Sequence, residues 1–178
     1  MNIEEEWALG YARQAGADFK AWKLYQEHPE VLVAQCHSLL FLQMACEKLC
    51  KAHLIGCGSE PQDLKSSHAY IAKHLPVIVR QEISFQKADV RRKAWVLNHV
   101  KHLAREIELL NPAVDRDGRR KDNCEYPWES NGMIFSPLDH CFSPSQLLTA
   151  PAGRTFVKLL ASAIERILQG TRGDETQT

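Results

Sequence analysis

The sequence has no uninterrupted apolar run long enough to cross a membrane, which takes roughly 18 residues. Its most apolar stretch, residues 31–46, is broken by four polar residues: Gln35, His37, Ser38 and Gln43. Three successive acids stand near its start, where a secretory signal would need basic residues followed by an apolar run. We therefore expect a cytoplasmic protein without membrane association.

The sequence also lacks an excess of charge of either sign. Lys plus Arg and Asp plus Glu both number 22, so the formal net charge is zero. A global field that attracts nucleic acid or anionic lipid is excluded, and any such partner would need a local patch. The length of 178 residues suits one domain. We expect residues 1–169 to form that domain and residues 170–178 to be a disordered tail.

The six cysteines include no Cys-x-x-Cys pair. One line along a helix would carry four candidate ligands: Cys46, Cys50, His53 and Cys57. At the helical rise per residue, the first and last of them lie roughly 16 Å apart. Four zinc ligands must lie within roughly 4 Å of one another, which a straight helix cannot provide. The sequence therefore predicts reduced thiols packed in a core, with no metal and no cofactor.

No alternating β-branched run bounded by turn residues predicts a strand. Apolar residues instead recur at three- and four-residue steps, the pattern of amphipathic helices. We predict helices over 4–28, 31–55, 65–83, 87–111 and 153–170, with a serine cap and a break at Pro76 in the third, and with Val90 and Ala94 on the core side of the fourth. The predicted fold class is all-α: an antiparallel bundle of four to five helices with a long ordered loop before the last helix.

That loop, residues 112–150, is longer than most structureless loops in compact domains. We expect four aromatic residues to hold it against the bundle: Tyr126, Trp128, Phe135 and Phe142. Tyr126 and Trp128 are expected to dock together near the last helix. Ser143, with Pro144 after it, is predicted to cap a short helix there.

Basic residues in the loop are candidates for phosphate contacts. Arg116, Arg119 and Arg120 are interleaved with acids, so a solvated loop is the alternative interpretation. The candidate nucleotide- or RNA-binding residues are Arg116, Arg119, Arg120, Lys121, Asn123 and Tyr126.

The second predicted helix carries Gln43, Ala45, Glu47, Lys48, Lys51 and Ala52. In this pattern the chain resembles the HEPN family (higher eukaryotes and prokaryotes nucleotide-binding). Residues 66–79 are similar to the His-containing third helix of that family, and the Tyr-Pro step within 122–128 falls where many members have one. The resemblance covers about residues 7–169.

This resemblance implies a prokaryotic protein of toxin or defence type that binds or acts on RNA or nucleotides, as a homodimer or with a cognate protein partner. The catalytic branch of the family cuts RNA without metal, using an Arg followed after four to six residues by a His. Only Arg92 and His99 have this spacing, so whether the chain is catalytic is left open. Glu47, Lys48, His68 and His74 are expected to be polar residues of the core.

Two alternatives stand beside this interpretation. The chain could be a non-catalytic helical interaction module that works through contacts of its helix faces. It could also be a small all-α adaptor whose recognition surface is the loop 112–150.

Overall fold

The computed structural model describes residues 2–28, 34–85, 89–114 and 121–170. Within these ranges the chain is all-α, as predicted, with five long helices, two short ones and one small hairpin. The long helices are α1 (Ile3–Glu27), α2 (Gln35–Gly56), α4 (Ile71–Ser84), α5 (Val90–Glu108) and α7 (Pro151–Gly170). The short elements are α3 (Pro61–Lys65), β1 (Trp128–Ser130), β2 (Met133–Phe135) and α6 (Ser143–Thr149).

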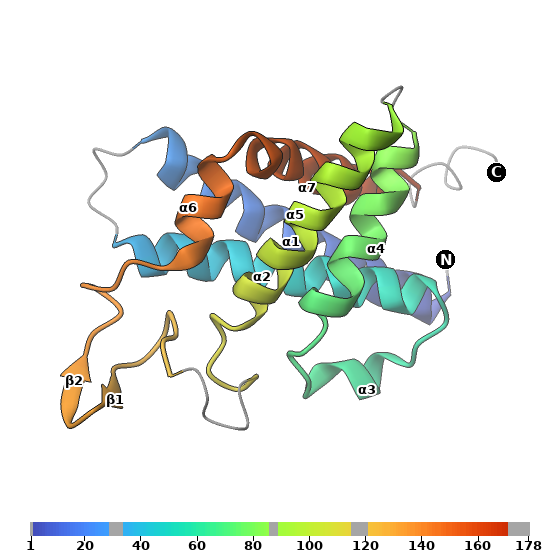
Figure 1. The fold of residues 1–178 in the computed structure, drawn as a ribbon. Coiled ribbons are helices and arrows are strands. Elements are labelled where there is room, and N and C mark those ends of the chain that lie inside the picture. Colours follow the sequence, from blue (N-terminus) through green and yellow to red (C-terminus); the bar gives the residue numbers. More distant parts are fainter. Residues whose placement is uncertain (1, 29–33, 86–88, 115–120, 171–178) are drawn as a thin grey trace.

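Two antiparallel helix pairs and α7 build the bundle (Figure 1). Helices α1 and α2 lie side by side, and the α4–α5 pair is steeply inclined to them. Helix α7 packs against α1, α4 and α5. None of the helices in the described ranges combines the length and the apolar character that a membrane span requires.

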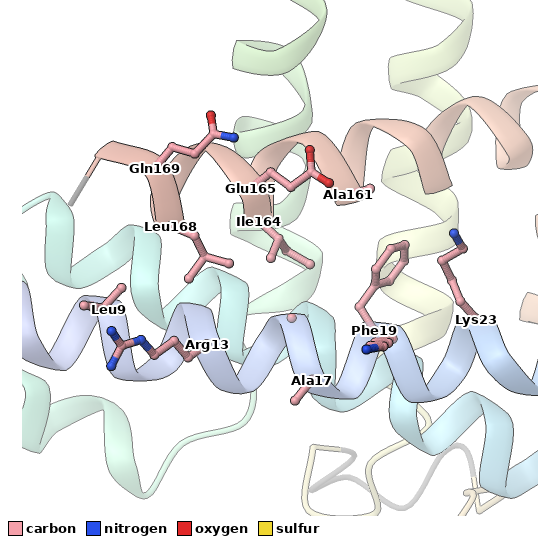
Figure 2. A pocket seen from close by; sticks show the side chains of 12 residues that line it. Leu9, Arg13, Ala17, Phe19, Lys23, Ala161, Ile164, Glu165, Leu168 and Gln169 are labelled. Atoms are coloured by element: carbon pink, nitrogen blue, oxygen red, sulfur yellow. The ribbon is translucent and has the colours of Figure 1, made fainter. Parts of the chain in front are cut away.

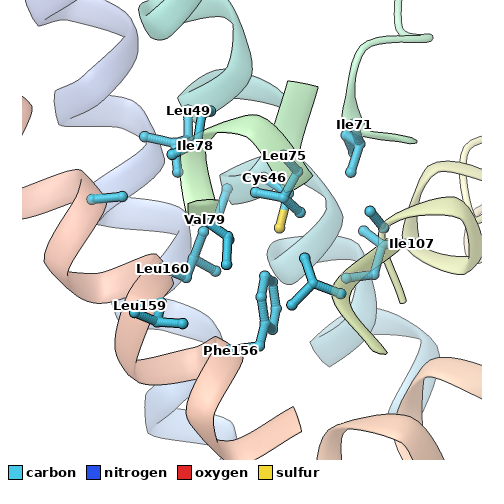
Figure 3. Packing of buried hydrophobic residues seen from close by; sticks show 14 of the residues in the cluster. Cys46, Leu49, Ile71, Leu75, Ile78, Val79, Ile107, Phe156, Leu159 and Leu160 are labelled. Carbon is cyan, nitrogen blue, oxygen red and sulfur yellow. The ribbon is translucent and has the colours of Figure 1, made fainter. Parts of the chain in front are cut away.

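The main core lies where α2, α4, α5 and α7 meet (Figure 3). Its side chains are nearly all excluded from solvent, and burying each large one contributes roughly 1.5–3 kcal/mol. The residues that meet there include Cys46 and Leu49 of α2, Leu75, Ile78 and Val79 of α4, Ile107 of α5, and Phe156, Leu159 and Leu160 of α7.

Local signals account for the ends of several helices. Asn2 and Glu5 form a capping box at the start of α1, each side chain accepting from the backbone N–H of the other at 2.8 Å. Helix α1 ends at Glu27, next to His28, as predicted. The Asp89 carboxylate caps α5 by accepting from the Arg92 N–H at 2.9 Å.

The predicted break at Pro76 is wrong, because α4 runs through it without interruption. Pro76 lies in the second turn, so the helix loses only the hydrogen bond to the Ala72 carbonyl. Leu75 and Val79 on either side are fully buried, and their packing stabilises the helix. The predicted serine cap is wrong as well, since Tyr70 precedes the helix and makes no side-chain cap.

The predicted core side of α5 is wrong over its first turns. Val90 is 82% exposed and Ala94 is also exposed, and the buried stripe begins at Val96. The tip of the α4–α5 pair extends beyond the other helices in Figure 1, which leaves the first turn of α5 without a neighbour to bury it. Phe85, which follows α4, is 71% exposed, with the Arg166 guanidinium of α7 4.6 Å from its ring centroid.

The described part of the long loop is anchored by a second core cluster. Phe142 is fully buried there, together with Cys36, Leu39, Leu110 and Cys124. Trp128 packs against this cluster, confirming two of the four predicted anchors. The predicted capping by Ser143 is wrong, because Phe142 occupies the cap position of α6 and no side chain caps it.

The other two aromatic residues behave differently. Phe135 stacks on Trp128 at 6.1 Å across the hairpin of β1 and β2, a strand pair that the sequence did not predict. Tyr126 is 60% exposed, so its predicted docking beside Trp128 is wrong. Asn123 causes this, since its Oδ1 accepts from the N–H groups of Glu125 and Tyr126 and turns the chain outward.

Candidate functional site

Glu47, on α2, is the centre of a buried polar cluster. Its Oε1 lies 2.8 Å from Lys51 Nζ and 3.1 Å from His68 Nδ1, and its Oε2 accepts from Gln43 Nε2 at 3.1 Å. Gln43 and Lys51 stand four residues on either side of Glu47, so one face of α2 carries all three. His68 reaches the cluster from the segment between α3 and α4.

The charges around Glu47 decide its protonation. Burial by itself would raise the pKa of Glu47, but hydrogen bonds and positive charge from Lys51 and then His68 outweigh it and lower the pKa. Glu47 is therefore an ionised carboxylate that orients the His68 ring. The side chain of His68 is 38% exposed, so this carboxylate-supported imidazole lies at the protein surface.

Lys48 and His74 do not join this cluster. Lys48 Nζ lies 3.1 Å from Oδ2 of the buried Asp18 and ties α2 to α1. His74 contacts the ring of Tyr70, with 6.3 Å between the ring centroids. Burial first, and then the positive charges of Lys73 and His53, lower the pKa of His74. The expected set of core polar residues is thus divided over three places.

Arg92 and His99 both lie on α5, two turns apart. His99 is half-buried, and its Nε2 lies 3.0 Å from the Leu147 carbonyl oxygen of α6, a distance at which the ring N–H donates. Arg92 is exposed in the first turn. Because the His99 ring holds α6 in place, it has a structural role that the sequence did not reveal.

The loop candidates are only partly described. Arg116, Arg119 and Arg120 lie outside the described residues. Lys121 is exposed, and Asn123 is buried with both ends of its amide bonded to loop backbone. Asn123 therefore shapes the loop, and Tyr126 offers an exposed ring beside it.

A group of cations that the sequence did not single out lies on α4 and α5. Lys73 and Arg80 of α4 and Lys101 and Arg105 of α5 line a pocket of about 290 Å³, and the other residues described around it are Ala72, Pro76 and Val77. All four cations are exposed. We call these four residues the basic face. No acidic side chain is among the described residues that line its pocket.

The acid next to the basic face is Glu108. Its Oε1 accepts from the N–H of Ala72 at 3.0 Å. Burial raises the pKa of Glu108, against the opposing effects of backbone N–H groups and the charge of Arg105.

Spacing was the sequence signal for this face. Lys73 and Arg80 are seven residues apart along α4, and Lys101 and Arg105 are four apart along α5, which places each pair on one side of its helix. The signal stays weak in the sequence, because nothing there shows that the two helices pack side by side.

Two cysteines of α2, Cys46 and Cys50, are buried and have free thiols. Burial raises the pKa of Cys46 and Cys50 well above the ordinary range of a thiol. Such thiols are protonated and pack as small apolar groups. Across the described ranges, no three His, Cys, Asp or Glu side chains are grouped as metal ligands.

A groove of about 650 Å³ runs between α1 and α7. Figure 2 shows Ile164 and Leu168 of α7 pointing toward α1 across it. Its α1 side carries Arg13, Lys20 and Lys23, and its α7 side carries Glu165. The groove has an apolar floor and a charged rim, as surfaces that contact other proteins often do.

Comparisons of the chain with protein-family models, with curated proteins and with solved structures found no match. Any function must therefore be inferred from the chain's own side chains.

Proposed function

We propose that this chain is a HEPN-like helical protein that binds RNA through the basic face of α4 and α5. The observation that carries the proposal is the set of four exposed cations around one pocket with no acid among its described lining residues. In a chain of zero net charge, this concentration of positive charge is local. Lys and Arg that contact phosphates supply most of the affinity of proteins for nucleic acids.

The dimensions of the basic face suit a nucleic-acid strand. Lys73 and Arg80 are two turns apart on α4, roughly 10 Å along its axis, and Lys101 and Arg105 are one turn apart on α5, roughly 6 Å. Trp95 of α5 is 50% exposed, and an exposed indole ring can stack on an unpaired base. We therefore propose single-stranded RNA as the substrate class.

Binding has better support than cleavage. His99, the one His with the family's spacing to an Arg, directs its Nε2 to the backbone of α6. A general base needs a ring nitrogen within hydrogen-bond reach of the substrate proton. The preference for RNA over DNA comes from the family resemblance, so the test includes both.

The test is fluorescence anisotropy with a labelled single-stranded 20-mer, as RNA and as DNA. In Arg80→Gln/Arg105→Gln we expect the affinity for RNA to fall at least about tenfold. We also expect the slope of the logarithm of the affinity against the logarithm of the salt concentration to become shallower by about 1.4. The matched control is Arg13→Gln/Lys20→Gln, which removes two cations from the groove of α1 and α7. An equal loss in both double variants, or no saturable binding, would contradict the proposal.

The same samples test catalysis. Intact RNA on a denaturing gel after incubation in EDTA supports a binding protein. Cleavage that disappears in Arg92→Ala, a change at an exposed residue of the same motif, would instead assign the ribonuclease reaction to this chain.

The groove between α1 and α7 favours a second candidate function, that of an interaction module which pairs with a second copy of itself. Its cationic α1 side and Glu165 on α7 are complementary in charge. Light scattering should then give the mass of a dimer, and Arg13→Glu/Lys20→Glu should shift it toward the monomer. A monomeric mass for the unmodified chain would exclude this candidate.

A further inference from the structure

A cavity of about 880 Å³ lies between α1, α2, α6 and α7, away from the basic face. Trp22 and Tyr25 of α1, Leu39 of α2 and Val157 of α7 give it apolar and aromatic walls. Its volume is within the range of sites that enclose small organic molecules.

The charged groups around this cavity are all cationic. Lys23 of α1 and Arg154 and Lys158 of α7 line it, and no Asp or Glu is among its described lining residues. Lys23 contacts Glu27 at 3.4 Å in an exposed pair, which screens it only weakly. Arg154 donates from Nη1 to the Thr149 carbonyl oxygen, which holds the guanidinium in place while its remaining N–H groups stay available.

The wall of the cavity also holds a buried donor without an acceptor. Trp22 is only 4% exposed, and its Nε1–H has no hydrogen-bond partner among the described residues. Two polar side chains that line the cavity have partners of their own: Gln26 Nε2 donates to Ser38 Oγ at 2.8 Å, and Gln35 Oε1 accepts from the Phe142 N–H at 3.3 Å.

We propose that this cavity binds a small organic anion, whose phosphate or carboxylate group is held by Arg154 and Lys158 and whose flat apolar body lies against Trp22 and Val157. Phosphate and carboxylate share the geometry that a guanidinium recognises with paired N–H donors. Trp22 Nε1 itself is covered, so the indole contributes its apolar surface to the site. The site is separate from the basic face, so a protein that fails to bind RNA can still bind this ligand.

The experiment is calorimetric titration of the full chain with four probes. 1-Naphthyl phosphate and 1-naphthoate carry both the anionic group and the flat body, inorganic phosphate carries the anionic group alone, and 1-naphthol carries the body alone. We expect at least one of the first two probes to bind at one per chain, and the last two to bind at least about tenfold more weakly because each lacks half of the recognised chemistry. The naphthyl probe that binds more tightly identifies the anionic group.

Variants then locate the site. Arg154→Gln/Lys158→Gln should weaken the better naphthyl probe by about tenfold or more, since both exposed residues supply charge-assisted contacts. Trp22→Phe keeps a ring but reduces the apolar surface of the wall, and should weaken binding a few-fold. Arg80→Gln/Arg105→Gln removes the same charge from the basic face and should leave the affinity unchanged.

The surface substitutions at 154 and 158 keep the test valid even if Trp22→Phe fails to fold. The proposal is overturned if neither naphthyl anion saturates at one per chain, or if the variants at 154 and 158 bind as tightly as the unmodified protein. It is also overturned if 1-naphthol binds as tightly as its phosphate and carboxylate counterparts.

Discussion

Lys51 Nζ lies 2.8 Å from Glu47 Oε1, one turn away on the same helix, and the two side chains are only 5% and 9% exposed. Both charges have left water, and each depends on the other for compensation. His68 and Gln43 supply the further hydrogen bonds that such a pair needs. The pair is therefore stable as a unit and sensitive to the loss of either member.

Replacing Glu47 should destabilise the fold strongly. We expect Glu47→Leu to lower the free energy of unfolding by about 3–5 kcal/mol, because it leaves the Lys51 charge buried without a partner. Glu165→Leu, at an exposed position of α7, should change it by less than about 0.5 kcal/mol. Urea unfolding of the two variants measures both values, and equal changes would show that the Glu47 pair is not a buried unit.

The same carboxylate should make stability depend on pH. An unfolded Glu titrates near about pH 4.3, and the pKa of Glu47 is lowered below its ordinary value in the folded chain. Its contribution is therefore complete above the unfolded pKa and is lost as the pH falls through the folded pKa. The difference in unfolding free energy between the unmodified chain and Glu47→Gln should be largest near neutrality and shrink in acid. The raised pKa of Glu108 acts in the opposite direction but is common to both proteins. A difference that is constant between pH 7 and pH 3 would contradict the prediction.

Gly153 should not tolerate alanine. A Cβ atom there would lie 2.2 Å from the Leu147 carbonyl oxygen and 2.7 Å from Leu148 Cα, both of them backbone atoms of α6. Gly153→Ala should therefore cost about 3 kcal/mol, toward the upper end for overpacking. Gly10→Ala is the matched control, since a Cβ atom there meets nothing within 4 Å and α1 should gain about 0.5–1 kcal/mol. Melting temperatures that move in opposite directions confirm the prediction.

Thiol reactivity should divide the six cysteines into two groups. Cys57 and Cys141 are exposed, whereas Cys36, Cys46, Cys50 and Cys124 are buried. Two thiols should react rapidly with a disulfide reagent in the native protein, and six after denaturation. Cys57→Ser/Cys141→Ser should abolish the rapid phase. A third rapid thiol in the native chain would show that a buried position opens readily.

Phe142 should be the main anchor of the loop. Phe142→Ala should cost about 3–5 kcal/mol, because the side chain is fully buried in the second core cluster. Phe135→Ala removes a ring of the same size from a position that is 36% exposed, and should cost clearly less. Chemical unfolding compares the two, and similar losses would mean that the hairpin stabilises the loop as much as Phe142 does.

Helix periodicity made most of the fold predictable. In the five long helices, apolar residues recur at helical spacing, and these residues form the packed faces of the helices. The end of α1 beside His28 follows from its local sequence. Val90 shows the limit, since it fits the period of α5 but projects beyond the helices that could bury it. Pro76 shows another, because packing around Leu75 and Val79 outweighed one missing hydrogen bond.

The hairpin was missed because its strands have only three residues each, too few for an alternating pattern. Its Asn131-Gly132 turn, with positive φ at both residues, was the available signal. The candidate site was less predictable still. The burial of Glu47 agreed with the expectation of a polar core residue, but the basic face and the Trp22 cavity combine residues from separate helices, and only their packing brings those residues together.

The position of α7 has a consequence for how the chain folds during its synthesis. Phe156, Leu159 and Leu160 fill the middle of the main core, yet they come from the last helix of the described chain. On the ribosome, the apolar sides of α2, α4 and α5 are made first and lack these partners until α7 emerges. Until α7 emerges, the nascent chain thus exposes these apolar surfaces, and a chaperone that shields apolar segments should associate with it during that interval.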